Sequence, residues 1–253
     1  MNLEFKLDWV LTFLLCSIRL SGLLLSAPFL QVLGLPMRLR AFLVLAISAC
    51  LVSSAELGPV DLALDVGPLI ALAVSELAIG ALMSFALFIA FAAFAFAGNA
   101  LDLQIGFNIA NLFDPITRRY SPLIASTFGM VAVALFFSMD VHHAMLRGFA
   151  YSLEKLPLGS LFTVPEPMLL ARQFGTIFTL GVLLAAPTLF CLFLVETAIS
   201  VVSRNLQQMN VLLLSTPIKI VVGMWVLAYS AGRMGPVAEK IFDSVFLFWE
   251  EVW

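Results

Sequence analysis

Long, uninterrupted apolar runs constrain this chain more than any other feature. Residues 67–97 and 168–200 each exceed the about 20 apolar residues that a helix needs to cross a bilayer. Of the 253 residues, 62% are hydrophobic and 11% are charged, whereas soluble domains are about 45–50% apolar and about 25% charged. Because the runs are continuous and do not alternate, they predict membrane helices and not a β-barrel.

The apolar runs predict an all-α membrane protein with about six long apolar helices. The run 67–97 is too long for one upright span, so it must tilt, bend or extend beyond the bilayer. Pro187 is expected to kink the run 168–200, and the shorter piece 141–156 is expected to be partly buried or interfacial. The predicted spans are 9–31, 39–55, 67–97, 122–139, 168–200 and 208–232.

One internal boundary is predicted at 157–167, which contains three prolines and a glycine. It separates a first part with four spans from a hairpin of two helices. The apolar residues of the C-terminal stretch 233–253 have the spacing of an amphipathic helix.

The stretch 98–122 lies between two apolar runs and differs from both. It is too rich in glycine, asparagine and charge for a membrane span. Phe107, Ile109, Leu112 and Phe113 make it too apolar for an ordinary solvated loop. Irregular backbone at membrane depth is tolerated only inside protein or beside a watery cavity. We therefore expect this stretch to line or close a cavity.

Four ionisable residues lie inside apolar runs: Arg19, Glu76, Glu196 and Lys219. A charge at the centre of a bilayer costs about 2.5–3.5 kcal/mol on insertion scales, so each needs a partner or water. These residues form either a proton or ion relay, or charge pairs between helices or subunits. The pairing interpretation is favoured because no run carries the repeated carboxylates or histidines of a relay.

A polar turn is predicted between the last two spans, where Arg204, Gln208 and Asn210 lie. Amides cannot remain unpaired in lipid. The turn is therefore either a simple polar hairpin or a contact surface inside an assembly, and the sequence leaves both interpretations open.

Asp140, His142 and His143 form a compact cluster. A zinc site on a helix favours ligands three or four residues apart, whereas adjacent residues point about 100° apart. The cluster is therefore interpreted as the polar end of a span or a subunit contact, and no metal site is predicted. The sequence has no G-x-S-x-G, H-E-x-x-H or phosphate-binding loop, so no catalytic residue or cofactor site is predicted. No basic patch indicates nucleic acid.

An ordered series of short motifs runs along nearly the whole chain. Its elements are Arg19 with Pro28, Pro36/Arg38/Arg40, Glu76 with Gly80, Ala97-Gly98 through Asp102-Leu-Gln104-Ile-Gly106-Phe107 to Asp114-Pro115, Asp140-Val-His-His143, Leu156-Pro-Leu-Gly159, and Ser203-Arg204 through Gln208-Met-Asn210 to Pro217-Ile-Lys219. This series resembles the FliR family of flagellar export-gate proteins, which is related to the SctT proteins of type III injectisomes. Val141 and Gln207 depart from the family pattern, which has glycine and often proline there.

The resemblance implies a structural subunit of a protein-export channel, with no enzymatic activity and no cofactor. Residues 1–157 would be a FliP-like helical part, and 168–253 a FliQ-like hairpin with an amphipathic C-terminal helix. The implied partners are FliP-type and FliQ-type subunits, an FlhB-type switch protein, exported unfolded flagellar proteins and membrane lipid, but no nucleic acid. The implied location is the flagellar basal body in the bacterial inner membrane, with the assembly projecting toward the periplasm.

The resemblance also implies a plug loop at 106–122 that obstructs the channel. Gly106 would permit the turn out of the preceding helix, and Asp114-Pro115 would stiffen the return. The expected plug and pore residues are Gly106, Phe107, Asn108, Ile109, Leu112, Phe113, Asp114 and Pro115. The expected polar contacts between subunits are Arg19, Glu76, Asp102, Gln104, Glu196, Arg204, Gln208, Asn210 and Lys219.

Two alternatives stay open. A small-solute or ion transporter would use Glu76, Glu196 and Lys219 in a polar pathway. The injectisome counterpart of the same gate would share the fold and differ in the exported proteins.

Overall fold

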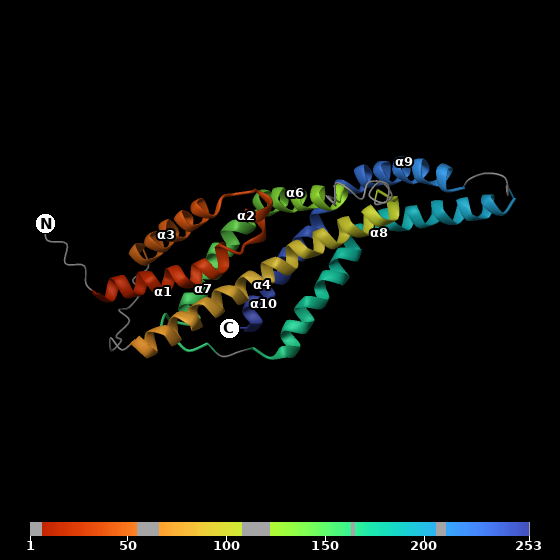
Figure 1. The fold of residues 1–253 in the computed structure, drawn as a ribbon. Coiled ribbons are helices and arrows are strands. Elements are labelled where there is room, and N and C mark those ends of the chain that lie inside the picture. Colours follow the sequence, from red (N-terminus) through yellow and green to blue (C-terminus); the bar gives the residue numbers. More distant parts are fainter. Residues whose placement is uncertain (1–6, 55–65, 108–121, 163–164, 206–210, 253) are drawn as a thin grey trace. The chain divides into compact units, whose positions relative to one another are not determined.

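The computed structural model describes residues 7–54, 66–107, 122–162, 165–205 and 211–252. In these ranges the regular structure is entirely helical, which confirms the all-α prediction (Figure 1). The helices are α1 (Leu7–Leu24), α2 (Pro28–Val32), α3 (Met37–Ser54), α4 (Val66–Ile105), α6 (Leu123–Ser138), α7 (Val141–Lys155), α8 (Pro167–Asn205), α9 (Val211–Ala231) and α10 (Gly235–Val252).

The prediction of six long apolar helices is not confirmed. In the described part of the chain, two single helices are long and apolar enough to cross a membrane, Gly67–Ile105 and Pro167–Arg204. The pairs α6 with α7 and α9 with α10 pass the same test only when each bent pair counts as one span. The 16-residue helix α6 illustrates the reason, because it is shorter than the roughly 20 residues that a span needs.

The first predicted span, 9–31, is also wrong as a single helix, because α1 ends at Leu24 and α2 begins at Pro28. Proline disfavours helical backbone in the preceding residue, and Ala27 has an extended ψ of 125°. The Arg40 guanidinium supports this break by donating to three main-chain carbonyls around it. They belong to Leu25, Leu30 and Leu35, at 3.2, 3.1 and 2.9 Å.

Helix α4 continues beyond the apolar run that predicts it. Residues 98–105, expected to be part of an irregular segment, are helical. Ala97, Leu101 and Ile105 are fully buried at helical spacing. Asn99 satisfies its amide locally by donating to the carbonyl of Ala95 at 2.8 Å. The polar composition of this end of α4 therefore does not break the helix.

The chain forms two compact units that interleave in sequence. Unit 1 contains residues 1–89, 140–173 and 244–253, and unit 2 contains 90–139 and 174–243. Helices α4, α8 and α10 each contribute to both units. These units are defined by packing in the folded chain. The boundary predicted at 157–167 instead separates a four-span part from a helical hairpin along the sequence, and it stays a prediction.

In unit 1, α1 packs on α3 and crosses the first part of α4 (Figure 1). The C-terminal half of α10 buries Val245, Phe248 and Trp249 while Leu247 and Glu250 remain exposed. The indole of Trp249 donates to the carbonyl of Met83 at 3.3 Å. This part of α10 is therefore amphipathic, as its sequence predicts.

In unit 2, four phenylalanine rings form the centre of the core. Phe242 packs on Phe91, Phe94 and Phe136, with ring centroids 5.8–6.1 Å apart. Helices α8 and α9 lie side by side as a hairpin (Figure 1). Helix α8 bends along its length in the same view, and Pro187 lies inside it.

Candidate functional site

The described residues at both ends of the predicted plug segment are hydrogen-bonded to one residue, Asp102. Its carboxylate is fully buried and accepts hydrogen bonds from the main-chain amides of Ile124 at 3.0 Å and Ala125 at 2.9 Å. These amides belong to the first turn of α6, whose N-cap, Pro122, makes no side-chain cap. Asp102 therefore caps α6 from α4, where a negative charge also interacts favourably with the helix dipole.

The main chain of Asp102 holds the other end of the segment. Its carbonyl accepts from the amides of Gly106 and Phe107, both at 3.2 Å. Gly106 has a φ of +94°, the left-handed backbone that ends many helices and that favours glycine. The predicted turn out of the helix at Gly106 is thus present.

A close backbone contact makes the Asp102 cap possible. A Cβ atom added to Gly98 would lie 2.4 Å from Cα of Ala125, closer than any real side chain tolerates. Gly98 lies one helical turn before Asp102 on α4, so the two residues share a face. The glycine lets α6 approach α4 closely enough for the carboxylate to reach the α6 amides.

Most of the predicted plug residues lie outside the described residues. Gly106 and Phe107 are described, and both are half-buried. The remaining members of the set, Asn108, Ile109, Leu112, Phe113, Asp114 and Pro115, fall in the range that the structure does not describe. Their obstructing role stays a prediction.

A second polar cluster lies in the core of unit 1, where Arg19 and Glu76 form an ion pair. Both side chains have 0% exposure, and Nε of Arg19 donates to Oε2 of Glu76. The other guanidinium nitrogens donate to the carbonyls of Ser152 at 3.0 Å and Leu156 at 2.9 Å. Oε1 of Glu76 accepts from the amide of Gly159 at 3.0 Å.

The Arg19–Glu76 pair thus ties the chain after α7 to α1 and α4. A Cβ on Gly80 would lie 2.0 Å from the carbonyl oxygen of Arg19, so the backbones of α1 and α4 touch one turn from Glu76. Ser75 extends the cluster because its hydroxyl donates to Ser160 at 2.9 Å and accepts from Phe162 at 2.7 Å. Main-chain carbonyls and amides carry no sequence signal, so sequence reasoning identified the charges but not these partners.

A third cluster joins three helices of unit 2. Lys219 on α9 donates to Oε1 of Glu196 on α8 at 3.0 Å, and Gln104 on α4 donates to Oε2 at 2.9 Å. The Glu196 side chain is 50% exposed, whereas that of Lys219 is 16% exposed. Three residues that the sequence singles out separately are therefore in one polar cluster that still reaches the surface.

The other predicted contact residues are Arg204, Gln208 and Asn210. Arg204 is exposed in the last turn of α8, where a positive charge interacts favourably with the helix C-terminus. Gln208 and Asn210 lie outside the described residues.

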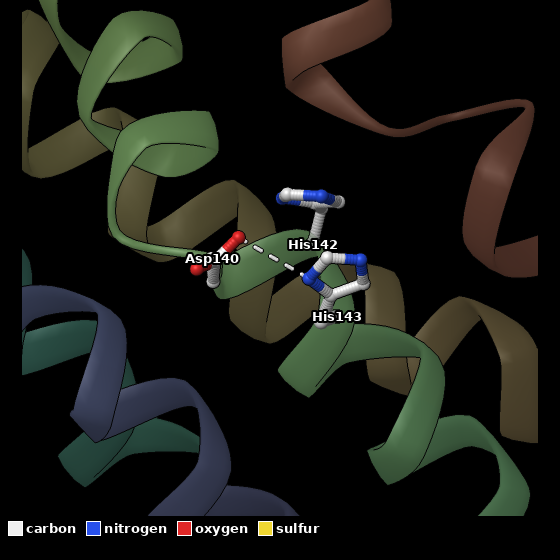
Figure 2. A group of neighbouring side chains, drawn as sticks. All are labelled: Asp140, His142 and His143. Atoms are coloured by element: carbon white, nitrogen blue, oxygen red, sulfur yellow. Dashed lines mark hydrogen bonds and ion pairs between the residues drawn. The ribbon is translucent and has the colours of Figure 1, made fainter.

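The cluster at the start of α7 corrects one sequence expectation. The sequence predicts that the adjacent imidazoles of His142 and His143 diverge, but their ring centroids are 4.0 Å apart (Figure 2). Nδ1 of His143 lies 3.2 Å from Oδ1 of Asp140. One potential ligand atom from each of the three residues lies within 4.8 Å of the other two. Both histidines lie inside α7, so rotation about their side-chain bonds brings together two rings whose backbone directions diverge.

Long apolar helices with buried, internally paired charges define a class, that of all-helical membrane proteins. Residues 10–245 match the model of a single family, described as bacterial export proteins, family 1. Because the match covers almost the whole chain, the chain belongs to that family. The resemblance read from the sequence motifs is confirmed.

Several named proteins are similar to this chain. The flagellar biosynthetic protein FliR of Bacillus subtilis (strain 168) is 28% identical over 241 residues, which cover 94% of this chain and 92% of that protein. FliR of Escherichia coli (strain K12) is 25% identical over 241 residues, covering 95% and 92%. The Yop proteins translocation protein T of Yersinia pestis is 29% identical over 168 residues, covering 65% and 64%.

Proposed function

We propose that the chain is a core structural subunit of the flagellar type III protein-export gate. With FliP-type and FliQ-type subunits it forms the channel through which unfolded flagellar proteins are exported. Family membership and the full-length similarity to FliR proteins support this proposal. The subunit lies in the bacterial inner membrane at the flagellar basal body, and the assembly projects toward the periplasm.

One observation supports this mechanism: Asp102 is hydrogen-bonded to the described residues at both ends of the proposed plug segment. Its carboxylate holds the start of α6, and its carbonyl holds the turn at Gly106. A segment that obstructs a channel needs fixed ends, because otherwise it would be pushed out with the first substrate. In this proposal Phe107, Ile109, Leu112 and Phe113 fill the lumen, and Asp102 fixes where the segment leaves and returns.

The proposal assigns residues 1–157 to a FliP-like part and 168–253 to a FliQ-like hairpin with its C-terminal helix. The half-exposed cluster of Gln104, Glu196 and Lys219 supports a polar contact with a neighbouring subunit, since its surface atoms can accept further hydrogen bonds. Arg204, Gln208 and Asn210 extend that contact at the hairpin end. The subunit performs no bond-making chemistry, and the energy for export comes from elsewhere in the apparatus.

A clean deletion tests the function. The deletion strain should be non-motile and should retain flagellin in the cell, and the wild-type chain should restore both. Normal filaments in the deletion strain would contradict the proposal. Co-purification from native membrane should recover four-span and two-span subunits of FliP and FliQ type, together with an FlhB-type protein.

A shorter deletion tests the plug. Removing residues 107–113 should raise the small-ion permeability of the assembled complex in planar bilayers, because the lumen loses its apolar filling. An equally long deletion of 56–62 is the matched control. Unchanged conductance in a complex that still assembles would refute the plug but leave the export role intact.

Two alternative functions make predictions that differ from those of a flagellar gate subunit. A solute or ion transporter predicts uptake by the purified chain alone in liposomes, whereas a gate subunit alone shows none. The injectisome counterpart predicts that the chain restores secretion in a strain lacking a protein like the Yersinia translocation protein. The flagellar function is favoured because the FliR proteins of Bacillus subtilis and Escherichia coli match 94% and 95% of the chain, whereas the Yersinia protein matches 65% of it.

A further inference from the structure

We propose that Asp140, His142 and His143 form a binding site for one divalent transition-metal ion of the Zn²⁺, Co²⁺ and Cu²⁺ class. The site lies in unit 1 at the start of α7 (Figure 2) and includes no residue of the polar clusters described above. The inference does not depend on the export function.

The donor set determines the class of ion. Two imidazole nitrogens and one carboxylate oxygen suit borderline transition metals, whereas Mg²⁺ and Ca²⁺ prefer oxygen ligands alone. Catalytic and exchangeable zinc sites commonly use three protein ligands of these kinds and leave further positions for water or another molecule.

The distances are compatible with one ion. Zinc lies about 2.0–2.2 Å from nitrogen and oxygen ligands, which places two ligands of a tetrahedral site about 3.4 Å apart. Oδ1 of Asp140 and Nδ1 of His143 are already 3.2 Å apart. One ligand atom of His142 lies within 4.8 Å of a ligand atom of each of the other two residues, a gap that small rotations about side-chain bonds can close.

The start of α7 brings the carboxylate of Asp140 to His143. Asp140 is the N-cap of α7, with φ of 56° and ψ of 22°, and its carboxylate does not cap the helix. An N-cap aspartate normally accepts an amide of the first turn, but here the side chain is directed toward His143 (Figure 2). The main-chain carbonyl of Asp140 still accepts from His143 and Ala144 at 3.0 and 3.3 Å, so the helix start is intact.

The exposure leaves room for an ion and its remaining ligands. The side chains of Asp140 and His143 are 75% and 61% exposed, and His142 is half-buried. The site is therefore open, with coordination positions for water or for a side chain of a neighbouring subunit. Such a site binds its ion reversibly.

Imidazole coordination can be assigned to this site without ambiguity, because His142 and His143 are the two histidines of the chain. The full-length protein is purified in detergent with an affinity tag that lacks histidine. Any imidazole coordination then comes from this site. Zinc is titrated by calorimetry, and Cu²⁺ is followed by electron paramagnetic resonance, which resolves nitrogen coupling.

The expected result is one Zn²⁺ per chain, and Cu²⁺ coupled to two imidazole nitrogens. His142→Ala and His143→Ala should each weaken Zn²⁺ binding at least about tenfold, and Asp140→Asn should weaken it too. Glu154→Gln, an exposed carboxylate on the same helix, is the matched control and should leave binding unchanged. Helical circular dichroism and the elution volume show that each variant folds.

Three outcomes would overturn the proposal. The first is Zn²⁺ binding no stronger than that of a variant lacking all three side chains. The second is Cu²⁺ coupled to a single imidazole nitrogen. The third is full Zn²⁺ affinity in both single histidine variants.

Discussion

Replacing Asp102 with alanine removes the acceptor of two main-chain amides at the start of α6. The carboxylate has 0% exposure, and its two oxygens accept from Ile124 and Ala125 at 3.0 and 2.9 Å. No side-chain cap at Pro122 replaces it. The first turn of α6 then has two buried donors without their acceptor, and the end of the proposed plug segment at α6 is no longer fixed.

The size of the effect follows from these two bonds. Each buried donor that loses its acceptor costs about 1–3 kcal/mol, so two set an upper bound of about 6 kcal/mol. Removing a buried charge relieves part of that cost. We expect a local loss of about 2–4 kcal/mol for Asp102→Ala. Asp102→Asn keeps one accepting oxygen, so it should cost about 1–2 kcal/mol.

Hydrogen exchange measures this local loss directly. In Asp102→Ala, amides in the first turn of α6 should exchange about 30- to 700-fold faster, since each 1.4 kcal/mol is about tenfold. Asp243→Ala, which removes an exposed aspartate from α10, is the control and should change nothing there. Exchange within about twofold of wild type would refute the assignment of Asp102 as the cap. Faster exchange without increased ion permeability would retain the cap and refute its role in fixing the plug.

Three further predictions address the other clusters. Glu76→Gln should destabilise the protein by about 3–5 kcal/mol, because it leaves the buried Arg19 charge uncompensated, and a thermal melt in detergent measures the loss. Gly80→Ala should lower the melting temperature, because its Cβ would collide with the Arg19 carbonyl; an unchanged melt would show that α1 and α4 separate easily. Glu196→Gln or Lys219→Met should change the free energy of unfolding by about 0–1 kcal/mol, because the ion pair is partly exposed. Either variant should nevertheless reduce the co-purification of neighbouring subunits. Full recovery of those subunits would argue against a subunit contact at this pair.

The sequence predicts the helical class and most helix cores because apolar periodicity is a local property. It fails where distant residues decide the outcome. The sequence predicts an irregular end of α4 because Asn99 and Asp102 are polar. In the structure Asn99 donates to a carbonyl of its own helix, and Asp102 caps α6. No local pattern reveals that a carboxylate accepts hydrogen bonds from amides 22 and 23 residues away.

Breaks in the helices are the second source of error. A window of apolar residues across Pro28 predicts one span, but the backbone restriction before proline ends α1 at Leu24. The imidazoles of His142 and His143 are a separate case, because rotation about side-chain bonds brings the rings together although their backbone directions on α7 diverge by about 100°. At Pro28 the backbone restriction imposed by one residue outweighs the hydrophobic pattern.

The hydrogen bonds of the carboxylates inside the apolar helices favour a structural gate subunit over a transporter with a proton relay. Glu76, Asp102 and Glu196 each have both oxygens engaged by donors of the described chain: Arg19 and Gly159, Ile124 and Ala125, and Lys219 and Gln104. A proton relay requires a carboxylate to gain and lose a proton in each cycle, which would break one of these bonds every time. Such groups are suited to holding helices in place. Proton flux through the assembled complex should therefore be the same in Glu196→Gln as in wild type, and its abolition by that single change would reinstate the transporter.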